Sequence, residues 1–124
     1  MADLLPPAWL IHAAVAAVWL YEGLWCKLLG KDPNQRAIVE AVPRLGRRIG
    51  LAFLVALGAV ELGLAAWVMI GIAPVACAIV QTGLLVALNT NGLVWSRRLI
   101  HDPGGMVVKN AAFLVLAWVA ASVP

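Results

Sequence analysis

The sequence predicts an all-α integral membrane protein, a four-helix bundle with a short amphipathic helix at the membrane surface between its first and second spanning helices. Of its 124 residues, 64% are hydrophobic and only 12% are charged, whereas soluble domains have roughly 25% charged residues. Apolar stretches recur four times, each close to the roughly 20 residues that cross a hydrocarbon core. We therefore expect a single transmembrane domain over residues 1–124.

The first spanning helix is expected over residues 8–28. Pro6 and Pro7 stand just before it, where a missing amide donor costs little. Trp9 and Trp25 lie near its two ends, as aromatic residues do at membrane interfaces. Because no basic residue precedes the apolar run, we interpret it as a retained helix rather than a signal peptide.

A short amphipathic helix is expected over residues 33–43. Asp32 fits its N-cap and Gln35 its third position, as in a capping box. Arg36 and Glu40 stand four residues apart on its polar face and are expected to pair. The opposite face is apolar, which predicts a helix lying on the membrane surface.

Three further spanning helices are expected over residues 49–70, 74–95 and 106–123. The very short turn between the first two of these makes them antiparallel neighbours. Small residues four apart, such as Ala59–Gly63 and Gly83–Ala87, predict close helix contacts.

The basic residues indicate the topology. All nine lie in or beside two segments, 27–48 and 97–109, so the net charge of +3 reflects membrane orientation rather than nucleic-acid binding. The positive-inside rule predicts cytoplasmic loops at 29–48 and 96–105 and both termini outside. We expect a multi-pass protein of the cell membrane, the inner membrane where there are two.

One carboxylate lies deep in the second expected span. Glu61 is the sole ionisable residue of the stretch 49–71 and lies about 18 Å along the helix. A charge at such a depth costs about 2.5 kcal/mol or more on insertion scales. Glu61 should therefore contact protein, a partner or a proton. Gln81 lies at nearly the same depth on the neighbouring helix, and a hydrogen bond between the two is expected.

Other polar residues gather nearer the predicted cytoplasmic face. An ion pair of Glu22 with Lys27 or with Lys109 would neutralise this cluster. Such residues can simply fix helix packing, but ionisable groups inside a membrane are also candidates for function. The full set of candidate ligand-binding residues is Glu61, Gln81, Glu22, Lys27, Asn89, Asn91, Lys109 and Asn110.

The cysteine and histidine residues form no recognisable catalytic or metal-binding motif. Cys26 and Cys77 are expected near opposite membrane faces, too far apart for a disulfide, and are interpreted as packing residues. His12 has no second ligand at suitable spacing. We expect no catalytic residue, no metal site and no intrinsic cofactor.

Four short motifs resemble those of the DoxX-like membrane proteins. They are GLWCK (residues 23–27), PNQ (33–35), VELG (60–63) and KN (109–110). The resemblance covers nearly the whole chain and implies a four-helix integral membrane protein. It marks Lys27, Glu61, Lys109 and Asn110 as the positions that carry the family pattern.

The resemblance also implies a class of function. The name-giving relatives are associated with quinone-linked sulfur oxidation and with membrane redox or detoxification complexes. We therefore expect an accessory subunit, or a binder of a hydrophobic small molecule such as a quinone, rather than an autonomous enzyme. Two alternatives remain open: a structural or assembly subunit of a larger membrane complex, and a small oligomeric transporter. The expected partners are the lipid bilayer and either a second copy or a larger complex.

Overall fold

The computed structural model describes residues 4–43 and 46–124 and confirms the all-α membrane fold class. No strand occurs within these ranges. The helical elements are α1 (Ala8–Leu20), its π-helical continuation η2 (Tyr21–Leu28), α2 (Pro33–Glu40), α3 (Gly46–Ile70), α4 (Pro74–Trp95), the 3₁₀ turn η3 (Arg97–Leu99) and α5 (Pro103–Ser122).

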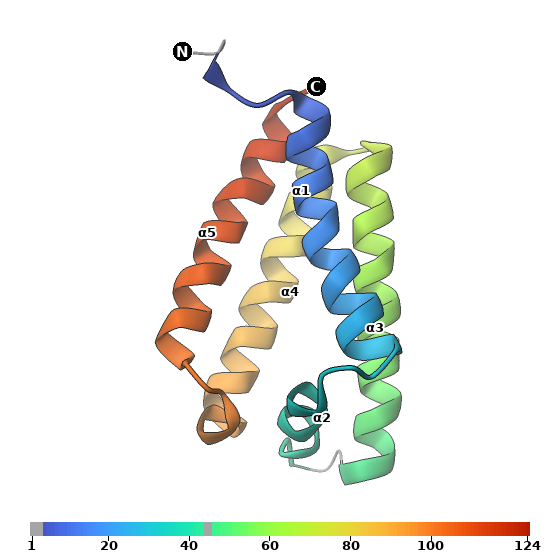
Figure 1. The fold of residues 1–124 in the computed structure, drawn as a ribbon, viewed down its shortest axis with the longest axis vertical. Helices are drawn as coiled ribbons and strands as arrows, with labels where there is room; N and C mark the ends of the chain where they lie inside the picture. The colour runs from blue at the N-terminus through green and yellow to red at the C-terminus, as the bar shows by residue number, and fades with distance from the viewer. Residues whose placement is uncertain (1–3, 44–45) are drawn as a thin grey trace.

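Among the described residues, four helices are long and apolar enough to cross a membrane: Ala8–Leu28, Arg48–Ile70, Pro74–Trp95 and Pro103–Ser122. Their large apolar side chains are widely exposed, which suits contact with lipid. α2 runs across one end of the bundle, which we call the α2 end. The start of α1 and the end of α5 lie at the opposite end, which we call the terminal end (Figure 1). The side of the membrane that each end faces stays a prediction.

The bundle consists of two helix pairs. α1 and η2 pack along α3, and α4 packs along α5. The pairs meet toward the terminal end, where α1 contacts α5, and α2 contacts both η2 and α4 at the other end (Figure 1). The main core lies in the terminal half around Trp19, whose indole meets the ring of Phe113 edge-on at 5.5 Å.

Several helix bounds differ from expectation, including the start of α3 at Gly46 rather than at 49, and two of the differences have an identifiable reason. α5 begins at Pro103 rather than at 106, because the Asp102 carboxylate accepts a hydrogen bond from the Gly105 amide at 3.0 Å and caps the earlier turn. α2 ends at Glu40, before Pro43, since a proline disfavours helical geometry in the residue before it. The expected Arg36–Glu40 ion pair is present at 3.1 Å.

The closest backbone approach joins η2 to α3. A Cβ atom on Gly23 would stand 2.7 Å from the carbonyl oxygen of Gly58, so only glycine fits there. The prediction of close helix contacts at Gly63 and Gly83 is wrong, because a Cβ atom at either position would meet no atom within 4 Å. These two glycines are on exposed faces of their helices.

Candidate functional site

A cavity of about 350 Å³ lies among the five main helices at the α2 end. We call it the inner cavity. Its apolar wall consists of Val18, Trp19, Ile38, Val39, Phe53, Leu54, Leu57, Leu85, Leu88, Met106 and Phe113. Its polar wall consists of Glu22, Lys27, Gln35, Glu61, Asn89, Asn91, Lys109 and Asn110. Seven of the eight candidate residues thus share one cavity.

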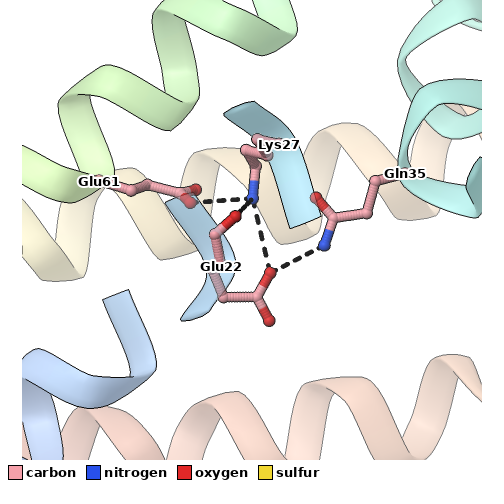
Figure 2. Close-up of polar contacts among 4 residues, drawn as sticks. All are labelled: Glu22, Lys27, Gln35 and Glu61. Carbon is pink, nitrogen blue, oxygen red and sulfur yellow. Dashed lines mark hydrogen bonds and ion pairs between the residues drawn. The ribbon is translucent and has the colours of Figure 1, made fainter. Parts of the chain in front are cut away.

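Lys27 holds the centre of the polar wall. Its Nζ donates to Glu61 Oε2 at 2.9 Å and lies 3.5 Å from Glu22 Oε2 (Figure 2). Lys27 is 7% exposed and Glu61 is 1% exposed, so protein atoms cover most of this ion pair. The partner of Glu61 is therefore Lys27, and of the two expected Glu22 pairs the structure forms the one with Lys27.

The π-helical geometry of η2 makes this arrangement possible. Residues five apart are rotated by about 140° in an α-helix, whereas a π-helix places residue i beside residue i+5. Glu22 and Lys27 are five apart, and Lys27 Nζ also lies 3.5 Å from the Glu22 backbone oxygen. The wider π-helical turn therefore places the side chains of Glu22 and Lys27 on the same face of η2, next to Glu61. Interruptions of this kind are frequent at functional sites.

α2 covers part of the inner cavity and is attached at both of its ends. Gln35 Nε2 donates to Glu22 Oε2 at 2.8 Å (Figure 2). The Ser96 hydroxyl, which is fully buried, donates to the Ile38 carbonyl at 2.6 Å. Sequence reasoning assigned Gln35 only to helix capping and so missed its place in the site. Its PNQ motif was the signal that could have indicated it.

Replacing Ser96 by alanine should loosen α2. The change removes the hydrogen bond to the Ile38 carbonyl, and such bonds contribute about 0.5–1.5 kcal/mol. We expect faster amide hydrogen exchange over residues 33–40, with little change in α4. Ser122→Ala is the matched control, since Ser122 is exposed and bonds only within its own helix, to Trp118. Equal exchange in the two variants would show that Ser96 does not hold α2.

The opposite polar wall comes from α4 and α5. Asn110 Nδ2 donates to Asn89 Oδ1 at 2.9 Å, and Asn89 Nδ2 donates to the Leu85 carbonyl at 2.8 Å. Lys109 is exposed and forms no ion pair or hydrogen bond with residues in the described part of the chain. Its ammonium group thus has no partner among the described residues.

Gln81 occupies a different place from the other candidates. It lines a smaller cavity of about 130 Å³ at the terminal end, which we call the outer pocket. Its Oε1 accepts a hydrogen bond from Trp19 Nε1 at 2.8 Å, and its Nε2 donates to the Cys77 carbonyl at 3.3 Å. The expected hydrogen bond between Gln81 and Glu61 is absent because each has another partner.

The comparisons with known proteins give one match. The model of a protein family described as the DoxX-like family matches residues 16–118, which is most of the chain and includes the whole polar wall of the inner cavity. No curated protein and no solved structure matches.

Proposed function

This chain belongs to the DoxX-like family, and from that premise we propose that it binds a hydrophobic small molecule with a neutral polar head group in the inner cavity. A quinone is the first candidate. The protein would act as an accessory subunit of a membrane redox system.

The inner cavity carries this proposal. Its volume of about 350 Å³ lies within the roughly 300–1,000 Å³ of small-molecule sites. Such sites are mainly apolar with a few convergent polar groups. Here Trp19, Leu88 and Phe113 contribute to the apolar wall, and Lys109 and Asn110 to the polar wall. An amphiphilic molecule with a ring or chain at one end and a polar head at the other matches this division.

The charges of the cavity favour a neutral head group. Glu22 and Glu61 supply two carboxylates, and Lys27 and Lys109 supply two ammonium groups, so the formal charge is already balanced. A charged head would add an uncompensated charge in a region of low dielectric, which is costly. A neutral carbonyl would accept a hydrogen bond from the Lys109 ammonium and would leave the balance intact.

The proposal also includes a route from the lipid. η2 packs against α3 and α2, whereas α5 packs against α4 and α1. The inner cavity lies between these two groups and is lined by Glu22 on one side and Lys109 on the other. In this proposal, an apolar tail would extend toward the surrounding lipid between η2 and α5.

Mass spectrometry of small molecules released from the detergent-purified protein tests the proposal. We expect one quinone or other lipid at a stoichiometric amount in the wild type, and loss of about tenfold or more in Glu61→Gln, which removes the charged partner that holds Lys27 at α3 and breaks the charge balance. Glu40→Gln is the matched control. It makes the same chemical change on α2, where Glu40 pairs with Arg36 outside the cavity.

The outcomes separate the candidate functions. Only bulk lipid in all three samples would refute ligand binding and favour a structural or assembly subunit of a larger membrane complex. A specific molecule retained equally in Glu61→Gln and Glu40→Gln would place the binding site elsewhere. Transport by an oligomer predicts movement of the same molecule between leaflets, which binding alone does not.

A further inference from the structure

The outer pocket and the inner cavity lie in line along the bundle. On α4, Gln81 lines the outer pocket and Leu85, one turn further, lines the inner cavity. On α5, Ala117 lines the outer pocket and Phe113, also one turn away, lines the inner cavity. One turn is about 6 Å of helix rise. The barrier between the two cavities is therefore a thin layer of side chains.

Trp19 and Gln81 form the centre of this layer. The Trp19 indole lines the inner cavity, the Gln81 amide lines the outer pocket, and a hydrogen bond of 2.8 Å joins them. Phe113 supports the indole from α5 by the edge-on ring contact. These contacts link α1, α4 and α5, so a small relative movement of the helices would part them.

We propose that Trp19 and Gln81 form a gate, and that Glu61 exchanges protons with the outer pocket when the gate opens and with the inner cavity when it is closed. The chain would then move protons across the membrane. This inference does not rest on the bound molecule proposed above.

The chemistry of the two cavities points to protons rather than larger solutes. Both have room for several water molecules, because a single water needs only about 10–15 Å³. The outer pocket includes the imidazole of His12, and the inner cavity includes the Glu61 carboxylate. A proton from water in one cavity would form the neutral acid of Glu61 and later pass to water in the other. No electron moves, and the carboxylate is regenerated.

Three other charged groups line the inner cavity with Glu61, and one of them, Lys109 on α5, forms no ion pair with residues in the described part of the chain. η2 contributes Lys27 and Glu22, and Lys27 is the direct partner. α1 contributes the neutral Trp19, and α2 contributes Gln35, which binds Glu22. Protonation of Glu61 would weaken its hold on Lys27, which can then turn further toward Glu22. This exchange of partners gives the carboxylate a way to accept a proton without leaving Lys27 unpaired.

Proton flux into proteoliposomes tests the gate, with a pH-sensitive dye inside and potassium with valinomycin to fix the membrane potential. We expect wild-type flux above that of protein-free liposomes. Gln81→Ala and Trp19→Phe each remove the gate hydrogen bond, and Trp19→Phe keeps an aromatic ring against Phe113. Both should raise the flux by several-fold up to about tenfold, as expected for the loss of one hydrogen bond. Adding Glu61→Gln to either should return the flux to the liposome background.

Trp118→Phe provides the matched control. Trp118 Nε1 donates to Thr82 Oγ1 at 2.9 Å, so this variant also removes an indole hydrogen bond to α4, but on an exposed face. Its flux should equal that of the wild type. Flux at the liposome background in the wild type and in both gate variants would overturn the proposal. So would gate-variant flux that Glu61→Gln leaves unchanged, because protons would then pass through a hole rather than through Glu61.

Discussion

Replacing Lys27 by methionine should lower the free energy of unfolding by about 3–5 kcal/mol, because it leaves a buried charge without its partner. Methionine keeps a long, flexible side chain but leaves the Glu61 carboxylate buried without its ammonium partner at 2.9 Å. Tryptophan fluorescence during denaturant titration in mild detergent measures the loss. Lys31→Met, at an exposed position beyond η2, controls for the loss of a positive charge and should be close to neutral.

A second substitution distinguishes pairing from packing. Lys27→Met combined with Glu61→Leu replaces the whole ion pair by apolar groups, and such replacements are often neutral or stabilising. We expect the double variant to recover most of the stability that the single variant loses. If Lys27→Met alone is as stable as the wild type, the ion pair does not hold η2 to α3.

Replacing Gly23 by alanine should separate η2 from α3 and lower the unfolding free energy by about 1–3 kcal/mol, as overpacking does in tight interiors. The new methyl group would stand 2.7 Å from the Gly58 backbone oxygen and 3.0 Å from Glu61 Cβ. Backbone cannot yield as a flexible side chain does, so the helices must move apart. The Lys27–Glu61 contact would lengthen with them, and ligand binding in the inner cavity should fall together with stability.

Gly63→Ala is the matched control for this prediction. Gly63 lies on α3, the helix that Gly23 approaches, and a Cβ atom there would meet nothing within 4 Å. Its effect should be neutral or stabilising by up to about 1 kcal/mol, the difference in helix propensity. Equal thermal shifts for the two variants would show that the Gly23–Gly58 approach is not a tight contact.

The sequence predicts the spanning helices well because their signal is local. Hydropathy and length are properties of a single segment. Whether that segment is long and apolar enough to cross the hydrocarbon core can be judged without knowing which helices lie beside it. The Arg36–Glu40 pair is local in the same sense, since four residues on one helix define it. Close contacts between helices are different, because the rotation of each helix decides which glycine faces a neighbour. Gly63 was therefore expected in a contact that Gly23 forms instead.

In the candidate site too, local features could be predicted from the sequence and contacts between helices could not. Depth along each helix grouped six of the candidate residues near one membrane face, and depth can be counted from the sequence. Depth alone placed Glu61 level with Gln81, whereas the structure brings Glu61 into the cavity with the six. The hydrogen-bond and ion-pair partners of each residue could not be predicted in this way, since they depend on the direction in which each side chain points. Glu61 turns to Lys27 rather than to Gln81, because η2 leaves the α-helical geometry that the sequence alone indicated. Gln35 was missed because α2 folds back over the cavity, which only the tertiary structure shows.

The ion pair between η2 and α3 also bears on how the chain enters the membrane during synthesis. Lys27 is near the end of the first span and Glu61 is near the middle of the second, so the second span inserted alone would present a carboxylate to lipid at a cost of about 2.5–3.5 kcal/mol. Inserted together as a hairpin, the two spans neutralise each other before either meets the acyl chains. We therefore expect the insertion machinery to release the first spanning helix only after the second has been synthesised. α2, which lies between them in the sequence, would fold against the two helices as they enter the lipid.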